Sequence, residues 1–590
     1  TFNSKELNLP EGPYFSASLS KTKSKTNFNL LKTVVEADIL EVVLSSAVTG
    51  ESLDKVEVKV EGLNLSGSIG SEDSKVSYEL KDLNGVLFAD DEGVAASFSG
   101  AMNFKGLEEV QLIVSSAEVE FNSRESSLDH VFNNKIYRFE GENYLKVATD
   151  NSKVQFSDGR DYFSGDFSFL VELNKGSGLD VTRLFAAVEN GTVHLGANEL
   201  VSMDQGNGAL VIDESGIAAD FSAAITINTN DAEAEGLFSA KINNTNSNQN
   251  HSLTIGGNSL KLDISASETE MIEGKGVRIS VGSQILSGHF MIKALPSLSD
   301  RVGVTIMNAQ VLVGDDSNKY IEVKVDRGAA LIDSKGVAVE ANGLINVLLP
   351  DVSAEGAFTV KIKTFEDSVY EAFFMEGKSS KLDIRAGPVM EVGGSEVNLN
   401  LAGQNMKGNI TFSSKDNGGM DVSLEDVNLS MGRGNTTYLS LTNGNGSLSL
   451  DELGMDGYMN VSKVEGMENV PGAEFPLGIS ADQVLVEFNT RKFPVTLDAA
   501  ETELPAGPYV RAFFSEVDLR LKDLNGPDGS SAQLKGDLFF ESSDGKLMLG
   551  FNDIESEVKI GGANGKFTKG SGAMIIGGRG LAGVFEGELD

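Results

Sequence analysis

Apolar and polar residues alternate along most of the chain. Val56, Val58 and Val60 fall on one face of an extended segment, and Glu57 and Lys59 fall on the other. Residues 320–326 and 420–431 follow the same period of two, which is typical of a strand with one buried face. No stretch keeps a helical period of 3.6 residues. The pattern therefore predicts an all-β chain of antiparallel strands, with much more strand than an ordinary globular protein and almost no helix.

A motif with two glycines occurs five times, at residues 84–100, 207–223, 327–343, 445–461 and 571–587. In the first four copies an Asp lies three residues before the second glycine, and its side chain can accept a hydrogen bond from the backbone two residues on. Glycine at the second position allows a positive φ without steric cost. The motif predicts five hairpin turns, with positive φ at Gly93, Gly216, Gly336, Gly454 and Gly580.

The spacing of this motif predicts a tandem array. The first glycines are Gly85, Gly208, Gly328, Gly446 and Gly572, whose numbers differ by 123, 120, 118 and 126. We expect about five units of roughly 120 residues. The openings that mark them are LPEGPY (9–14), EGENYL (140–145), IEGKGV (272–277), RAGPVM (385–390) and LPAGPY (504–509). The predicted units are 1–139, which is divergent, 140–271, 272–385, 386–503 and 504–590, which is truncated. We expect a longer array to continue beyond both ends.

A third motif, apolar-x-Gly-x-apolar, lies at residues 65–69, 163–167, 286–290, 406–410 and 534–538. In the last four copies its glycine comes 36 to 43 residues before the first glycine of the hairpin motif, from the residue numbers. In the first copy Gly67 comes only 18 residues before Gly85. The first unit has therefore either lost about two strands or aligns differently at this point.

Two architectures fit these repeats, and both are elongated. The chain has no Pro- or Ser-rich linkers between units, and related phrases recur inside units at 236–242 and 356–362. These features favour a stacked β-rod in which each unit pairs with its neighbours. A string of discrete β-sandwiches is the alternative.

Composition limits the partners of the chain. With 48 Lys and Arg against 87 Asp and Glu, the formal net charge is −39, which repels nucleic acid phosphates and anionic lipids. Cysteine is absent, which removes disulfides, thiolate nucleophiles and Cys-ligated zinc. No apolar run approaches the ~18 residues that a membrane helix needs. We expect no nucleic acid partner and no membrane insertion within this chain.

Residues with catalytic chemistry are sparse. His130, His194, His251 and His289 do not recur at equivalent repeat positions, and no zinc-protease, nucleophile-elbow or phosphate-loop motif is present. We therefore expect a chain that is not an enzyme, with no catalytic and no cofactor-binding residues.

Calcium is the one ion that the loops could accept, and the sequence assigns no residues to a calcium site. Candidate loops lie at 89–93, 157–161, 314–318 and 415–421. None matches the EF-hand or the calcium β-roll repeat, and their carboxylates do not recur with the units.

The phrases LPAGPYV (504–510) and GAMIIGGRGLAGVF (572–585) resemble the repetitive regions of very large bacterial surface and secreted proteins. The resemblance covers essentially the whole chain and is weak in residues 15–60 and 101–140. It implies a structural role outside the cell or at its surface, as a stalk, spacer or fibre subunit. The expected partners are the neighbouring repeats and other copies of the chain in a filament. An adhesive module that recognises a surface glycan or protein through repeat loops is the alternative.

Overall fold

The protein chain falls into two compact units in this computed structural model. One contains residues 1–228, 234–277 and 291–302, and the other contains residues 229–233, 278–290 and 303–590. The structure describes residues 26–30, 33–45, 55–69, 76–107, 110–132, 135–141, 144–156, 161–171, 183–195, 199–255, 258–266, 270–294, 301–315, 317–375, 378–415, 418–433, 436–467, 477–481, 483–497, 502–522, 531–543, 546–560, 563–577 and 580–589.

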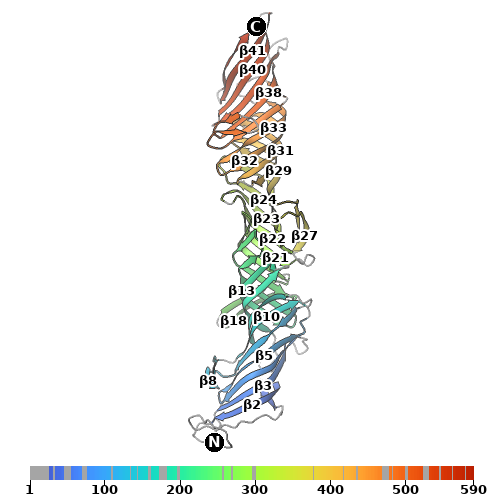
Figure 1. Cartoon of the computed structure of the whole chain (residues 1–590), viewed down its shortest axis with the longest axis vertical. Coiled ribbons are helices and arrows are strands. Elements are labelled where there is room, and N and C mark those ends of the chain that lie inside the picture. The colour runs from blue at the N-terminus through green and yellow to red at the C-terminus, as the bar shows by residue number, and fades with distance from the viewer. Residues whose placement is uncertain are drawn as a thin grey trace. The chain divides into compact units, whose positions relative to one another are not determined.

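The described residues form strands and turns with no α-helix, so the predicted all-β, antiparallel fold is confirmed. Figure 1 shows long strands lying side by side in sequence order within each unit. The strands of the first unit, apart from two side hairpins described below, are β1 (Thr26–Leu30), β2 (Thr33–Ser45), β3 (Lys55–Ser68), β4 (Ser77–Asp90), β5 (Gly93–Lys105), β6 (Val110–Ile113), β7 (Ser116–Asn122), β10 (Tyr144–Phe156), β11 (Asp161–Val171), β12 (Leu184–Leu195), β13 (Val201–Asp213), β14 (Gly216–Ala223), β15 (Ile225–Ile227) and β17 (Phe238–Asn243).

Four strands have residues in both units, and they are β16 (Ala232–Glu235), β20 (Glu270–Val281), β21 (Gln284–Ala294) and β22 (Arg301–Gly314). The second unit continues with β23 (Lys319–Asp333), β24 (Gly336–Val347), β25 (Val352–Glu355), β26 (Ala357–Lys363), β29 (Val389–Leu401), β30 (Gln404–Ser414), β31 (Met420–Arg433), β32 (Thr436–Asp451), β33 (Gly454–Met467), β34 (Leu477–Ser480), β35 (Gln483–Asn489), β38 (Tyr509–Lys522), β39 (Ser531–Ser543), β40 (Lys546–Ile560), β41 (Ala563–Gly577) and β42 (Gly580–Leu589).

Pairs of adjacent polar residues encode bulges in the long strands. In β31 the buried positions are Met420, Val422 and Leu424, and then Val427, Leu429 and Met431. The polar pair Glu425 and Asp426 interrupts the alternation, and the register with both neighbouring strands shifts at this point. Asp426 has a φ of 51°, and its N–H donates to Oδ1 of Asn445 on β32 at 3.2 Å. The bulge takes up the extra residue and returns the next apolar side chain to the buried face.

These bulges explain the apolar-x-Gly-x-apolar motif. The motif glycine lies beside a bulge of the next strand, where a Cβ would meet backbone. On Gly408 of β30 it would lie 2.8 Å from Cα of Val427, and on Gly536 of β39 it would lie 2.8 Å from the carbonyl oxygen of Asp553. On Gly288 of β21 it would lie 2.6 Å from Cα of Ala309. The motif therefore marks a close approach of two backbones.

In the first predicted repeat, residues 1–139, Gly67 is not the structural counterpart of the motif glycine in the other repeats. Gly67 pairs with Tyr78 at the end of β3, away from the register shifts that follow Val60 and Leu63. The shift between β2 and β3 falls between the pairs made by Glu36 and Asp38. The counterpart of the motif glycine is therefore Ala37. The first predicted repeat has four strands up to and including the first arm of its hairpin, β1 to β4, and the second repeat has the same number, β10 to β13. The first repeat has therefore not lost strands.

The hairpin motif forms the predicted turns. In the first four copies the second glycine pairs with the residue three positions before it, across a two-residue turn, and in the fifth copy Gly580 pairs with Gly577. In the first four turns the Asp Oδ1 accepts the backbone N–H two residues on, at 3.1, 2.8, 3.0 and 2.8 Å. The φ angles of Gly93, Gly216, Gly336 and Gly454 are 146°, 147°, 146° and 135°, as predicted. The fifth turn, residues 578–579, lies outside the described residues.

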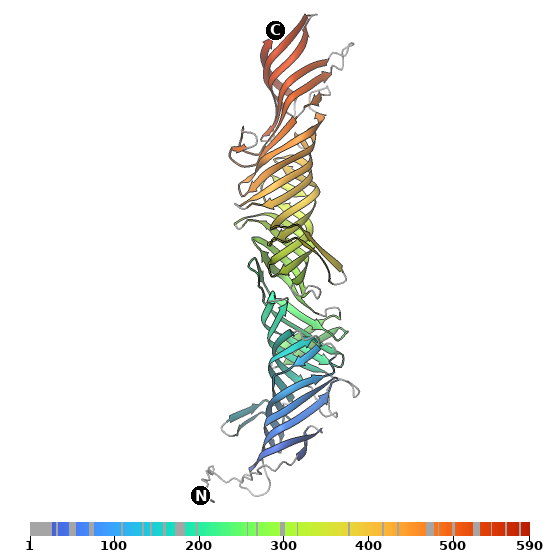
Figure 2. The same cartoon turned by 45° about the vertical axis from the view of Figure 1, so that its right-hand side comes forward.

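The sheet of each unit curls so that its apolar face packs against itself. Phe163 on β11 and Phe221 on β14 belong to strands that are not paired, yet their ring centroids are 5.1 Å apart. Phe358 on β26 and Phe412 on β30 make a similar contact at 6.4 Å. Figure 2 shows strands crossing in front of and behind one another within each unit. Each such ring, fully removed from water, stabilises the fold by about 1.5–3 kcal/mol.

Replacing Gly216 with Val is expected to destabilise the second hairpin by about 2 kcal/mol, because a β-branched residue is strained at positive φ. The new Cβ would also lie 2.3 Å from Oδ1 of Asn244. Hydrogen exchange of the amides in β13 and β14 measures the change. As a control, Gly282→Asn should leave exchange nearly unchanged, because Gly282 has a φ of 54° with no atom near its Cβ position. Equal effects of both changes would contradict the steric explanation.

Candidate functional site

Among the described residues, four short hairpins leave the long strands and form separate two-stranded sheets, which we call the side hairpins. Figure 1 labels β8, β18 and β27 at the side of the long strands. The side hairpins are β8 (Leu128–Phe132) with β9 (Lys135–Phe139), β18 (Gln249–Ile255) with β19 (Asn258–Ile264), β27 (Val369–Met375) with β28 (Lys378–Ile384), and β36 (Val495–Leu497) with β37 (Thr502–Leu504). They follow β7, β17, β26 and β35 in the chain.

A reciprocal pair of hydrogen bonds joins the base of each side hairpin to the hairpin turn. After Gly216, Ile217 N–H donates to Oδ1 of Asn244 at 2.6 Å, and Asn244 N–H donates to the carbonyl of Ile217 at 3.1 Å. The same exchange joins Val94 with Ser123, Val337 with Thr364, and Met455 with Thr490. We call Ser123, Asn244, Thr364 and Thr490 the capping residues. They lie 29, 27, 27 and 35 residues beyond their partners.

The residue before each capping residue is buried and closes the base of the side hairpin. Asn243 is 0% exposed, and its side-chain N–H groups donate to the carbonyls of Ser247 and Ser265 at 2.8 and 3.0 Å. Its Oδ1 accepts Thr245 N–H at 3.0 Å. Asn489 makes all three corresponding bonds in the fourth copy, and Asn122 makes two of them in the first, with the carbonyl of Glu140 and the N–H of Arg124. We use the name hairpin anchor for three parts together: the buried residue, the capping residue, and the hairpin turn to which the capping residue is bonded.

Lys363 replaces the buried asparagine in the third hairpin anchor. Its Nζ donates to the carbonyl of Asp367 at 2.8 Å and to that of Phe365. Burial lowers the pKa of Lys363, against the opposing charges of Glu366 and Asp367. A long cation therefore reaches the carbonyl four residues on, which the short amide of Asn243 or Asn489 binds in its own copy, and in addition the carbonyl of Phe365. Both side chains satisfy backbone acceptors that would otherwise be buried without a donor.

The sequence phrase LPAGPY (504–509) lies at the end of the fourth side hairpin, where the chain returns to the hairpin anchor. The carbonyl of Pro505 accepts the Asn489 side chain at 2.7 Å, and Gly507 N–H donates to the carbonyl of Arg491 at 2.6 Å. A Cβ on Gly507 would lie 2.2 Å from the carbonyl oxygen of Asn489. Glycine is therefore required by a close approach. The predicted opening of a unit is thus a structural closure of the preceding side hairpin.

Buried arginines bridge two of the hairpin anchors to their acidic turns. Arg124 binds Asp90 and Glu92 of the first turn, and Arg491 binds Asp451 of the fourth turn and Asp456 on β33. Burial of Asp90 opposes ionisation, but the hydrogen bond and charge of Arg124 outweigh it and hold the pKa of Asp90 below its usual range. These acids serve as partners of a structural cation.

The side hairpins pack back onto the long strands, and in the third copy Leu382 and Ile384 of β28 are 0% and 1% exposed where β28 lies against β23 and β24. Phe139 contacts Val86, Phe88 and Ala95 in the first copy. Leu262 and Ile264 cover Ala209, Val211 and Ala218 in the second, and Leu497 and Leu504 pack with Tyr509 in the fourth. Other side chains of the hairpins face solvent, with Tyr370 73% exposed, Val131 61% and Ile136 56%. The exposed set differs from copy to copy.

The candidate histidines have separate surroundings. His130 on β8 lies 2.6 Å from Oε1 of Glu57, and His251 on β18 lies 2.8 Å from Oε1 of Gln249. His194 lies 3.0 Å from Oε1 of Glu199. Among the described residues these three do not share a partner. The absence of catalysis stays a prediction.

The structure brings together two of the loops considered for calcium. Asp315 accepts the N–H groups of Ser317 and Asn318 at 2.8 Å each and that of Gly419 at 3.1 Å. The hydrogen bond from the Tyr320 hydroxyl is the largest of the effects that lower the pKa of Asp315 to about 2. Its oxygens thus already accept four donors, an arrangement that joins loops without an ion.

The other two candidate calcium loops give less support for an ion site. Asp90 and Glu92 of residues 89–93 bind Arg124, and residues 157–160 lie outside the described residues. Within the described ranges, no group of three or more His, Asp or Glu side chains could hold a metal. The assignment of a metal site stays open.

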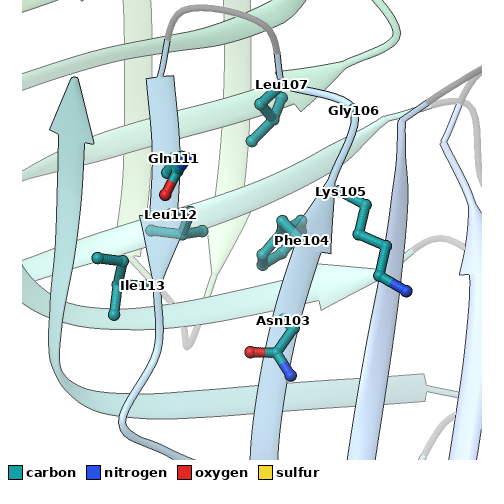
Figure 3. Close-up of a pocket in the computed structure, with 8 residues that line it drawn as sticks. All are labelled: Asn103, Phe104, Lys105, Gly106, Leu107, Gln111, Leu112 and Ile113. Atoms are coloured by element: carbon teal, nitrogen blue, oxygen red, sulfur yellow. The ribbon is translucent and has the colours of Figure 1, made fainter. Parts of the chain in front are cut away.

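A hollow of about 380 Å³ lies where β5 turns into β6. Its lining comes from the two arms of this one turn (Figure 3) and comprises Asn103, Phe104, Lys105, Gly106, Leu107, Gln111, Leu112 and Ile113. Lys105 is the only charged residue among the described residues of the lining, and its Nζ pairs with Glu79. The described residues of the lining include no acid–base pair and no residue of the hairpin anchors.

A buried acid between two lysines predicts a pH dependence. Glu273 Oε2 lies 2.9 Å from Nζ of Lys241, and Oε1 lies 2.8 Å from Nζ of Lys275. Burial raises the pKa of Glu273, but the hydrogen bonds and charges of both lysines outweigh it and lower the pKa from 4.5 to about 2. Because the pKa is lower in the folded chain, ionised Glu273 stabilises the fold at pH values above the pKa that this acid has in the unfolded chain.

We therefore expect about 3 kcal/mol of stability in the pairing of β17 with β20 to be lost as pH falls from 4.5 towards 2. Hydrogen exchange of the amides in β17, corrected for intrinsic rates, measures this loss. The Glu273→Gln variant should show a flatter profile over the same range. An identical slope in both proteins would assign the loss to other groups.

No family model matches the chain, and no curated protein matches it. No helix formed by the described residues is long and apolar enough to span a membrane.

Sequence reasoning missed the hairpin anchors. A signal was present, since Phe121-Asn122-Ser123-Arg124 and Phe488-Asn489-Thr490-Arg491 share one pattern at the end of a strand. The other two copies read Ile242-Asn243-Asn244 and Ile362-Lys363-Thr364 and are harder to recognise.

Proposed function

We propose that the chain is a structural spacer, as a stalk or fibre segment of an extracellular or cell-surface protein. The observation that carries the proposal is the hairpin anchor, whose reciprocal hydrogen bonds between the turn and the capping residue recur in four copies. Residues that recur in a binding or catalytic array are expected to be exposed and chemically active. The residues that recur in the hairpin anchors hold backbone together, whereas the exposed residues differ between copies.

The strand order and the charge support the same role. Most long strands pair with strands that are close in sequence, so that each unit depends mainly on its neighbours and length can grow with unit number. The formal net charge of −39 makes molecules of this chain repel one another at low salt, which favours solubility. The resemblance of the sequence to surface-protein repeats is consistent with an extracellular place.

Small-angle X-ray scattering of the purified chain tests the proposal. A single globule of this length would have a radius of gyration of about 25 Å. A spacer should give a value at least about twice as large, since its units would follow one another along an axis. A value near that of the globule would reject the spacer and revive a compact binding protein.

An adhesive module is a second candidate, favoured by the exposed apolar side chains of the side hairpins. Tyr370 has 73% of its surface exposed, and Nζ of Lys381 lies 4.9 Å from the centre of its ring. Arrays of surface glycans and matrix proteins test this candidate. Saturable binding that falls at least about tenfold in Tyr370→Ala, and is unchanged in Lys335→Ala on an exposed turn, would favour adhesion.

A further inference from the structure

Another hollow, of about 370 Å³, lies at the base of the third side hairpin, where β27 and β28 meet β26 and β29. Its lining includes Lys361, Tyr370, Asp383, Arg385 and Glu391, which all belong to the second compact unit. Its volume is within the range of sites that bind small molecules. The hollow brings an aromatic ring together with hydrogen-bond donors and acceptors.

Tyr370 supplies an aromatic surface at this hollow. The residue is 73% exposed, and Nζ of Lys381 lies 4.9 Å from the centre of its ring. The face of an aromatic ring carries partial negative charge, and C–H groups of a ligand pack favourably against it. A sugar ring presents several C–H groups on one face, so that an exposed tyrosine can serve as its platform.

Three cations lie at or beside the hollow, and each has an acid as its partner. The pairs are Lys381 with Asp383, Arg385 with Glu391, and Lys361 with Glu340. Since the charges cancel within the pairs, the site favours an uncharged ligand over an ion. A carboxylate accepts several hydrogen bonds and a guanidinium donates up to five. Hydroxyl groups, which both donate and accept, match such a mixed set.

The second side hairpin has part of the same arrangement. In both hairpins a lysine lies 3.0 Å from the Asp two residues after it, and the residue opposite this Asp is Tyr370 in one and Asn250 in the other. Two more positions differ between the copies, with Ser265 in the place of Arg385 and Met271 in the place of Glu391.

The first and fourth side hairpins have Asp129 and Thr496 in the place of Tyr370. Among the four side hairpins, the ring and the Arg–Glu pair thus distinguish the third copy. The comparison predicts one site per chain.

We propose that the hollow beside Tyr370 binds an uncharged sugar residue of a glycan. One face of the sugar ring packs against the tyrosine. The sugar hydroxyls donate to the carboxylates of Asp383 and Glu391 and accept from the guanidinium of Arg385. The proposal rests on the adhesive role given above as the second candidate, and it adds the class of glycan and the place where it binds.

The test uses tryptophan as both platform and reporter, since the chain has no tryptophan of its own. Tyr370→Trp places a single indole at the hollow, and Asn250→Trp places one at the matching position of the second side hairpin. Each whole-chain variant is titrated with the methyl glycosides of glucose, galactose, mannose and N-acetylglucosamine up to about 20 mM. The methyl glycoside of glucuronic acid serves as the charged probe. We expect a saturable change in emission with a neutral glycoside in Tyr370→Trp and none in Asn250→Trp.

Saturation-transfer NMR supplies a second measurement without a tryptophan. Affinity for the neutral glycoside should fall at least about fivefold in Tyr370→Ala and change less than about twofold in Tyr370→Phe, which keeps the ring. No saturation with any neutral glycoside, a response to the charged probe alone, or equal responses of the two tryptophan variants would overturn the proposal. If no sugar binds and the arrays show a protein ligand that depends on Tyr370, the proposal fails and the adhesive role survives. If neither binds, both fail.

Discussion

Replacement of Arg491 by Met is expected to destabilise the fourth hairpin anchor by about 3–5 kcal/mol, because it removes one partner of a buried ion pair. Arg491 is 6% exposed, and Asp456, which it binds through Nε, is 9% exposed. Met keeps much of the volume of the arginine stem and none of its charge. The loss would therefore come mainly from the carboxylate of Asp456, which stays buried without a cation.

Hydrogen exchange followed by mass spectrometry is the suitable measurement, because a chain with two compact units need not unfold in one step. The amides of β33 and β35 should lose protection, whereas those of β4 and β5 in the other unit should keep theirs. Lys492→Met, at an exposed neighbouring position, should change protection by less than about 0.5 kcal/mol. Unchanged protection of β33 in the Arg491 variant would mean that the bridge contributes little.

Replacement of Asn243 by Ala is expected to cost about 3 kcal/mol and to release the second side hairpin from its base. The change removes donors from the carbonyls of Ser247 and Ser265 and an acceptor from the N–H of Thr245. These groups lie at a site where Asn243 itself is 0% exposed, so that part of the lost bonding cannot be replaced by water.

Limited proteolysis measures this release, since cleavage within residues 244–266 should become faster in the variant. Hydrogen exchange of β18 and β19 supplies the free energy. Asn250→Ala on the same side hairpin is the control, because Asn250 is exposed and its side chain makes one long contact of 3.5 Å with Asp263. Cleavage at equal rates in the two variants would contradict the role assigned to Asn243.

The sequence by itself determined the class of the fold and the positions of its turns. Alternation is a local property of each strand, and Asp213 and Gly216 define a turn through bonds and φ angles within four residues. The bulges were also locally encoded, since a pair such as Glu425 and Asp426 breaks the alternation of β31. The repeat spacing pointed to the places where equivalent contacts occur, while the predicted unit boundaries and the elongation of the array stay predictions.

Only the tertiary structure decided which residues hold the side hairpins. A capping residue binds a turn 27 to 35 residues away, and Ser, Asn and Thr all supply the oxygen that the bond requires. Asn243 and Lys363 occupy equivalent places although they share neither shape nor charge, because each has to satisfy backbone carbonyls in a buried site. Such positions are selected by geometry between distant segments. A sequence pattern is defined by residue types, and residues of several types can make these contacts. The pattern therefore does not identify such positions.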